Sequence, residues 1–310
     1  MPPTPKKRPP TRKAAQKPAT PTSKKHAITA DDCFGDLTET EVQYGHFIMF
    51  YSEVGEGKTT LAAQFEKPLF VQTAGEQGAI IHRQSGQIDN AISIVNLEPL
   101  YSPENIPSHG GHPGWLKCME TMKRFATKKH DRKTLVIDGV SGLQELCFQH
   151  CASLHYNGDI NSKGKDGFQS YHTGHRIAAE NYWSAEFMQA CLEIVRRGYN
   201  VILLAHSTFK TVDNPIGENF DMARPALHKQ VLEFTKKDLH GIFYLGRNVS
   251  VVIDEKSKKK TTVGADRFVG LSPSQWYMAK SWGNHPQHNE VKCGKSAAET
   301  YKNLVGVLNF

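Results

Sequence analysis

The sequence predicts an α/β fold with a mostly parallel central sheet flanked by helices and a β-hairpin near the C-terminus. Two observations support this class. Short runs that are apolar on both faces alternate with longer amphipathic stretches, and strands buried on both faces are typical of parallel sheets. Because parallel strands need crossover connections, this alternation indicates right-handed β-α-β units.

The elements follow from this pattern in chain order. Six apolar runs are predicted strands, at residues 47–51, 69–73, 92–97, 135–138, 201–205 and 242–245. Helices are predicted at residues 59–65, 115–129 and 178–197, the last ending at Gly198. Residues 157–174 predict an exposed loop because they are rich in Gly, Asn, Ser and Lys. Residues 249–254 and 261–263 flank a charged turn and predict the hairpin, with a short strand expected near residues 276–279.

Composition excludes several classes of protein. The 310 residues are 38% hydrophobic and 22% charged, and no apolar run approaches the roughly 20 residues that span a bilayer. No membrane association and a cytoplasmic location are therefore expected. The six cysteines are too dispersed for a disulfide framework. Cys147 and Cys151 lie one helical turn apart near His150 and His155, but core packing is the favoured interpretation and no metal cluster is predicted there.

Positive charge is concentrated in residues 1–27, a Pro- and Lys-rich segment with eight Lys or Arg and no acidic residue. Residues 28–310 carry 30 basic against 31 acidic residues and are close to neutral. The segment 1–27 has no aromatic residue and too little apolar surface to offset its ordering entropy, so it is predicted to be a disordered tail. Contact with nucleic acid and a solubilising role both stay open for it.

A glycine-rich loop between the first predicted strand and helix predicts binding of ATP and Mg²⁺. Small residues let backbone N–H groups approach phosphates, a Lys reaches the β- and γ-phosphates, and a hydroxyl ligates Mg²⁺. Lys58 and Thr59 fill the last two roles. Ser52 replaces the first Gly of the pattern G-x-x-x-x-G-K-[ST] and is interpreted as a tolerated variant. The predicted nucleotide-binding segment is Ser52, Glu53, Val54, Gly55, Glu56, Gly57, Lys58, Thr59 and Thr60.

Asp138 ends an apolar run, T-L-V-I-D. An aspartate at the end of a buried strand beside such a loop is the usual second support of Mg²⁺. Thr59 and Asp138 are therefore the predicted metal residues, with a structural cap as the alternative role of Asp138.

The order of these motifs resembles the RecA-like P-loop ATPases, especially a phage-type AAA-domain family associated with phage recombination. The resemblance rests on residues 47–65, 67–78, 134–146, 198–207 and 222–230. It implies that residues 28–310 form one RecA-like ATPase domain, with a core at about 45–250 and a hairpin and strand extension at 249–310. It also implies a homo-oligomer, located in the bacterial host cytoplasm if a phage encodes the chain.

The resemblance also implies roles for three further residues. Gly139, not Glu, follows Asp138, and RecA-like proteins place the catalytic base just after the second strand, where Glu76 lies. Glu145 is the competing candidate for the base, and a solvated loop residue is the alternative role of Glu76. His206 corresponds to a polar residue that senses the γ-phosphate, with a structural histidine as an equal alternative. Lys280 loosely matches a basic residue that reaches a neighbouring subunit's nucleotide, although a structural lysine is favoured.

The segment 207–224 corresponds to the loop that contacts single-stranded DNA in recombinases. Phe209, Lys210 and Arg224 suit stacking and backbone contacts, but three acidic residues in the same segment argue against a strongly basic groove. The expected function is ATP-controlled binding of single-stranded DNA in phage-type recombination, repair or replication. The alternatives are a nucleotide-gated assembly protein with little hydrolysis, and an ATPase that acts on a protein partner.

Overall fold

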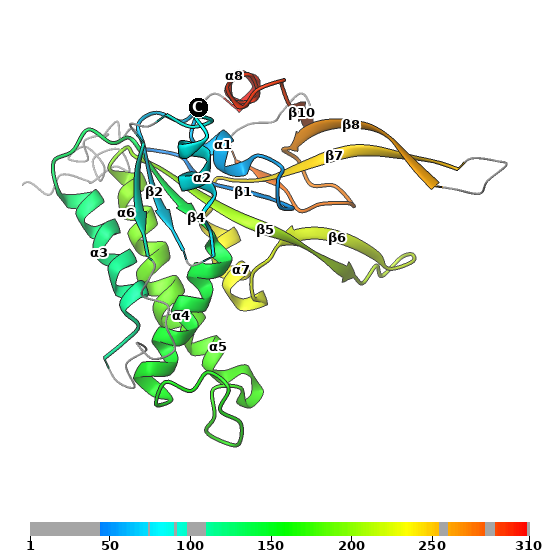
Figure 1. Ribbon diagram of the computed structural model, residues 1–310. Coiled ribbons are helices and arrows are strands. Elements are labelled where there is room, and N and C mark those ends of the chain that lie inside the picture. The colour runs from blue at the N-terminus through cyan, green and yellow to red at the C-terminus, as the bar shows by residue number, and fades with distance from the viewer. Residues whose placement is uncertain are drawn as a thin grey trace, which may run out of the picture. The chain divides into compact units, whose positions relative to one another are not determined.

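The protein is represented by a computed structural model, shown in Figure 1, that describes residues 44–73, 75–89, 92–97, 110–253, 260–282 and 289–308. The backbone alone is described for residues 249–253 and 260–265. The predicted tail at residues 1–27 lies outside the described residues.

A central, mostly parallel sheet organises the described part of the chain, as predicted. Its main strands are ordered β10-β8-β7-β1-β5-β4-β2-β3, while β6 pairs with β5 and β9 with β7. All contacts from β7 through β1, β5, β4 and β2 to β3 are parallel. The strands are β1 (Phe47–Ser52), β2 (Pro68–Gln72), β3 (Ser93–Asn96), β4 (Thr134–Asp138), β5 (Asn200–Val212), β6 (Phe220–Pro225), β7 (Gly241–Ile253), β8 (Lys260–Gly270), β9 (Lys280–Ser281) and β10 (Glu290–Lys292).

Helices cover both faces of this sheet. Successive side chains of a strand point to opposite faces, and on each face they pack against helices in a separate hydrophobic core. Phe47, Met49 and Tyr51 of β1 join one core, while Ile48 and Phe50 join the other. The first core also takes residues of α3 (Pro113–Thr127), α4 (Val140–His155), η3 (Ala178–Met188), α6 (Gln189–Arg196) and α7 (Lys229–Asp238). The second takes residues of α1 (Lys58–Ala62), α2 (Gly78–Gln84) and α8 (Ala297–Leu308).

The predicted helix at 178–197 is part of a longer helical stretch. It begins with α5 (Thr173–Ile177), continues through the π-helical segment η3 and ends with α6. Gly198 follows with φ +84°, the left-handed conformation expected after a helix. The predicted loop before this stretch is largely confirmed, although it contains the short 3₁₀ turn η2 (Ser170–His172).

The prediction that residues 207–224 form a loop is wrong. The predicted strand at 201–205 continues to Val212 and pairs in antiparallel register with β6, from Ser207↔Pro225 to Val212↔Phe220. The predicted C-terminal hairpin is confirmed as β7–β8, which is longer than expected. Near residues 276–279 the chain forms only an isolated bridge, Ala223↔Tyr277, and the strand β9 begins one residue later.

The two hairpins extend beyond the carboxyl edge of the sheet (Figure 1). Ser52, the last residue of β1, lies opposite His206, and β5 continues six residues further. Similarly, Tyr244 of β7 lies opposite Tyr51, and β7 continues to Ile253. The glycine-rich loop follows β1 at this same edge, where ligands of open α/β sheets commonly bind.

Candidate nucleotide-binding and catalytic site

The glycine-rich loop connects β1 to α1, as the sequence predicted. The Lys58 ammonium lies inside the loop and donates to Ser52 O at 3.2 Å, Ser52 Oγ at 2.9 Å and Glu53 O at 3.0 Å. These acceptors partly replace the hydration that the buried amine has lost, and burial lowers the pKa of Lys58. Ser52 therefore does more than fill the first position of the loop, because its hydroxyl contacts the lysine directly.

Two glycines give the loop its path. Gly55 has φ +86° and Gly57 has φ +89°, which is the left-handed region that side chains rarely adopt. A Cβ at Gly55 would meet nothing within 4 Å, whereas at Gly57 it would lie 3.3 Å from Thr60 Oγ1. The Thr60 hydroxyl in turn donates to Gly57 O at 3.0 Å. Backbone conformation thus explains both glycines, and the open space at Gly55 lets a ligand approach the main chain.

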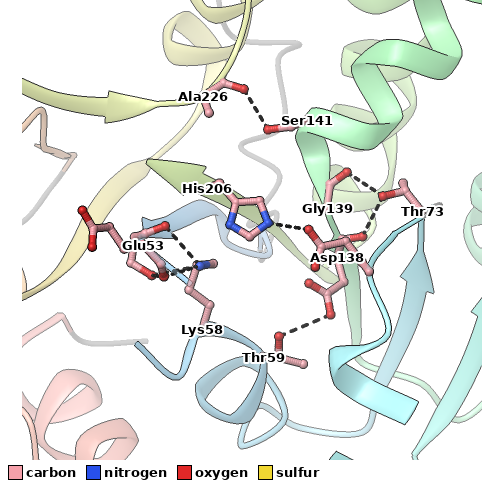
Figure 2. A network of polar contacts seen from close by, with 11 residues as sticks. Glu53, Lys58, Thr59, Thr73, Asp138, Gly139, Ser141, His206 and Ala226 are labelled. Atoms are coloured by element: carbon pink, nitrogen blue, oxygen red, sulfur yellow. Dashed lines mark hydrogen bonds and ion pairs between the residues drawn. The ribbon is translucent and has the colours of Figure 1, made fainter. Parts of the chain in front are cut away.

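Thr59 and Asp138 come together although 79 residues separate them. The Thr59 hydroxyl donates to Asp138 Oδ2 at 3.3 Å (Figure 2). Burial, together with the nearby charge of Glu76, raises the pKa of Asp138 to about 6. A hydroxyl and a carboxylate held together at a raised pKa are oxygen donors that suit Mg²⁺, whose charge would stabilise the ionised carboxylate.

Glu76 lies in the same cavity. Its Oε1 is 2.6 Å from His206 Nε2. Gly139, at φ +90°, leaves room for it, since a Cβ there would lie 2.4 Å from Glu76 Cγ and 2.3 Å from Thr73 Oγ1. The competing candidate Glu145 is exposed on α4 and is absent from the described lining of this cavity.

His206 connects the cavity to the β5–β6 hairpin. Its carbonyl accepts from the Ala226 N–H at 2.7 Å, directly after β6. The Ala226 carbonyl accepts from Ser141 Oγ at 2.7 Å, and Ser141 lies on α4 just after Asp138, as Figure 2 shows. One short chain of bonds therefore joins the base of the hairpin to the strand end that carries Asp138.

These groups line a cavity of about 260 Å³. It contains five predicted residues of the loop together with Glu76, Asp138 and His206, so the structure brings the main predicted site residues together. Five other lining residues were not predicted as part of the site: Gly78, His82, Gly139, Leu204 and Ala205. Of these, Leu204 and Ala205 could have been found from their place at the end of the predicted strand that precedes His206.

Two arginines near the loop were also missed. Arg247 of β7 donates from Nε to Glu56 Oε1 at 2.6 Å. Arg267 of β8, which lies opposite Arg247, has a guanidinium nitrogen 3.5 Å from the position of a Cβ at Gly57. About 200 residues separate these arginines from the loop, so only the pairing of β7 with β1 and β8 reveals their place.

Lys280 lies away from this cavity. It is opposite Ile242, near the start of β7, whereas the loop follows the carboxyl edge. Its ammonium donates to Lys236 O at 2.8 Å and Lys237 O at 3.2 Å in the last turn of α7, and lies 3.9 Å from the centre of the Trp282 ring. These contacts favour the structural alternative, and action on a neighbouring subunit's nucleotide stays a prediction.

Cys147 and Cys151 are buried, and their thiols lie 3.6 and 3.7 Å from the carbonyl oxygens of Ala178 and Gly174. This environment agrees with the predicted packing role. Among the helices that the structure describes, none has the length and apolar character required of a membrane span.

Comparison with known proteins gives a family. An AAA domain model matches residues 45–281. No curated protein matches. Among solved structures, the flagellar accessory protein FlaH from Methanocaldococcus jannaschii is similar at 13% identity and a TM-score of 0.41, with 83% of this chain and 89% of that chain covered. Since the family model spans most of the sequence and the P-loop lies within it, this chain belongs to the AAA domain family and has a nucleotide-binding ATPase fold.

Proposed function

We propose that this protein binds ATP with Mg²⁺ in the cavity behind the glycine-rich loop and hydrolyses it with Glu76 as the general base. The observation that carries this proposal is the position of Glu76. Its carboxylate shares the cavity with Lys58, Thr59 and Asp138, and is oriented by His206 at 2.6 Å.

The loop residues suit the phosphates. The Lys58 ammonium is bound to two main-chain carbonyls and one hydroxyl of the loop, and a β- or γ-phosphate would be a stronger, charged acceptor for the same donor. Thr59 and Asp138 would hold Mg²⁺, which supplies neutralisation of phosphate charge when bound. Lys58 and Thr59 at the start of α1 and Asp138 at the end of β4 line the same cavity, so one bound nucleotide with its Mg²⁺ could contact both sets of groups.

Glu76 is suited to accept a proton from the attacking water. Its Oε1 is occupied by His206 Nε2, which leaves Oε2 as the oxygen for the water. His206 Nδ1 is buried and has no hydrogen-bond partner, so it accepts no competing contact that would turn the ring. A general base of this type contributes about 10²–10⁴-fold to the rate.

We further propose that ATP controls binding of single-stranded DNA by the β5–β6 hairpin, in phage-type recombination, repair or replication by a homo-oligomer. Phe209 and Lys210 are exposed on this hairpin, and base stacking with backbone contacts suits such a pair. His206, which touches the proposed base, lies at the hairpin's own start. A γ-phosphate that draws His206 away from Glu76 would therefore act directly on β5.

Two other functions are consistent with the same cavity. A nucleotide-gated assembly protein would bind ATP and turn it over very slowly, and an ATPase that acts on a protein would show no response to DNA. Ile216, at the tip of the β5–β6 hairpin, is 95% exposed. An exposed apolar side chain at this position supports contact with a macromolecule, either DNA or a protein.

The experiment compares Glu76→Gln with Glu145→Gln, measuring ATP affinity and turnover with and without single-stranded DNA. Glu76→Gln is expected to keep ATP affinity and to lower turnover at least 100-fold, while Glu145→Gln keeps both. Lys58→Ala serves as the binding-deficient reference. Loss of turnover in Glu145→Gln alone would contradict the assigned base, and turnover indifferent to DNA would favour a protein partner.

A further inference from the structure

A cluster of three histidines lies outside the proposed ATP site. His172 and His175 come from η2 and α5, and His228 directly precedes α7. One ligand nitrogen from each ring lies within 4.8 Å of the others. The rings of His175 and His228 are stacked, with centroids 4.7 Å apart and planes 14° apart.

Two of these rings have a nitrogen that makes no hydrogen bond among the described residues. His175 Nδ1 and His228 Nδ1 are both buried and have no hydrogen-bond partner. Buried polar atoms without partners are rare and call for a specific explanation. A neutral imidazole with a free nitrogen is the form that binds metals.

Aromatic side chains hold the two inner rings in place. Phe148 of α4 packs edge-on against His175 at 4.8 Å and against His228 at 5.8 Å. Phe168 also packs edge-on against His175, at 4.9 Å. The third ring, His172, is exposed and follows a tight turn in which Tyr171 and His172 have φ of +46° and +57°. Packing therefore limits the two inner rings to small movements, whereas the exposed outer ring is less constrained.

We propose that His172, His175 and His228 bind one Zn²⁺ ion through three imidazole nitrogens, with water as the fourth ligand. Imidazole is a preferred ligand of Zn²⁺, and three protein ligands with one open position are a common arrangement. Zn–N bonds of about 2.0–2.1 Å require the nitrogens to approach one another to about 3.3 Å. Rotation of the stacked His175 ring and a small shift of the exposed His172 turn supply this closure.

A zinc ion at this site would join the segment directly before α5, which contains η2, to the start of α7. His228 lies three residues after the end of β6. Its backbone N–H donates to Gln144 Oε1 of α4 at 2.6 Å. Zinc would thus fix the base of the β5–β6 hairpin against α4 and α5. This inference is independent of ATP hydrolysis, because none of the three histidines is among the described residues that line the ATP cavity.

The test is zinc binding by the full chain after chelator treatment and dialysis, without nucleotide. Calorimetric titration with Zn²⁺ is expected to give one ion per chain, and Co²⁺ is expected to show visible absorption bands typical of a four-coordinate site. His172→Gln and His228→Gln should each weaken Zn²⁺ binding at least tenfold. His82→Gln, which changes a histidine of α2 outside the cluster, should bind as the unchanged chain does.

Asp138→Asn separates this site from the proposed Mg²⁺ site. Zinc binding at the histidines should survive this substitution, even if it abolishes ATP turnover. Because His172 is exposed, His172→Gln should fold normally, which a thermal unfolding curve in chelator would verify. Equal zinc affinity in the unchanged chain and in both histidine variants, or loss of all zinc binding in Asp138→Asn, would overturn the proposal.

Discussion

At the scale of single residues, Gly139 explains how Glu76 reaches the cavity. A side chain at this position would collide with both Thr73 and Glu76. Gly139→Ala is expected to displace Glu76, lower turnover by about 10²-fold and lower the melting temperature. The left-handed backbone alone costs about 1–3 kcal/mol for a non-glycine residue, and the collision adds to this.

Gly164→Ala is the matched control for that substitution. Gly164 has φ +105°, and a Cβ there would meet nothing within 4 Å. It therefore carries the backbone strain without the collision, and thermal unfolding of the two variants isolates the packing effect. Equal melting temperatures and unchanged turnover in Gly139→Ala would contradict the proposed role of Gly139.

Asp138 predicts a dependence of stability on pH. Its pKa of about 6 in the folded chain exceeds the usual value of about 3.9, so between these values the folded chain binds a proton that the unfolded chain releases. This residue's contribution to stability therefore falls as pH rises from about 4 to 6, by about 3 kcal/mol in total. Without Mg²⁺ and nucleotide, Asp138→Asn should be more stable than the unchanged chain at pH 8.

At pH 5 the stability gain of Asp138→Asn should be about half of its value at pH 8. The reason is that pH 5 lies midway between the unfolded and folded pKa values of Asp138, so only about half of the destabilisation has developed. The control is Asp131→Asn. The Asp131 side chain is 71% exposed, so replacing its carboxylate removes no cost of burying a charge. Chemical unfolding at pH 5 and pH 8 measures both variants. A gain that is equal at the two pH values would show that Asp138 is not the titrating group.

At the scale of elements, strands buried on both faces could be predicted from sequence because burial alone makes them apolar. β1, β2, β4 and the first half of β5 are of this kind. The second half of β5 could not be found in this way. Its residues His206 to Val212 are partly or fully exposed, and they are a strand only because β6 supplies hydrogen bonds across the hairpin.

The same distinction applies to the candidate site. Lys58, Thr59 and Asp138 could be predicted because each lies at or shortly after the end of a buried strand, within a local motif. The contacts of Arg247 with Glu56 and of Ser141 with Ala226 join segments 191 and 85 residues apart. No local pattern carries such pairings, since they depend on strand order in the sheet.

The β5–β6 hairpin carries its own prediction for DNA. Phe209 is 55% exposed, and stacking on one base contributes about 1–3 kcal/mol. Phe209→Ala should therefore weaken single-stranded DNA binding about 10-fold and reduce DNA-stimulated hydrolysis, with basal hydrolysis unchanged. Tyr44→Ala, which removes another exposed aromatic ring just before β1, is the control. Unchanged DNA affinity in Phe209→Ala would remove the hairpin from the proposed DNA site.

At the scale of the whole molecule, charge divides the chain into two unequal parts. Residues 1–27 carry eight basic residues and no acidic one, whereas the remaining residues are close to neutral. Acidic side chains also occupy the hairpin, where Asp221 accepts from Thr211 at 2.8 Å and Asp213 from Asn219 at 3.2 Å. Non-specific attraction to DNA should therefore come mainly from residues 1–27, while control by ATP should come from the domain.

Deletion of residues 1–27 tests this division. Each phosphate neutralised on a single strand contributes about −0.7 to the slope of log affinity against log salt concentration, so the truncated chain should bind DNA more weakly and with a flatter slope. Its basal ATP hydrolysis should be unchanged, and DNA should still stimulate it at saturating concentration, since His206 links the hairpin to Glu76. If all stimulation disappears with residues 1–27 while basal hydrolysis persists, the domain acts on a partner other than DNA.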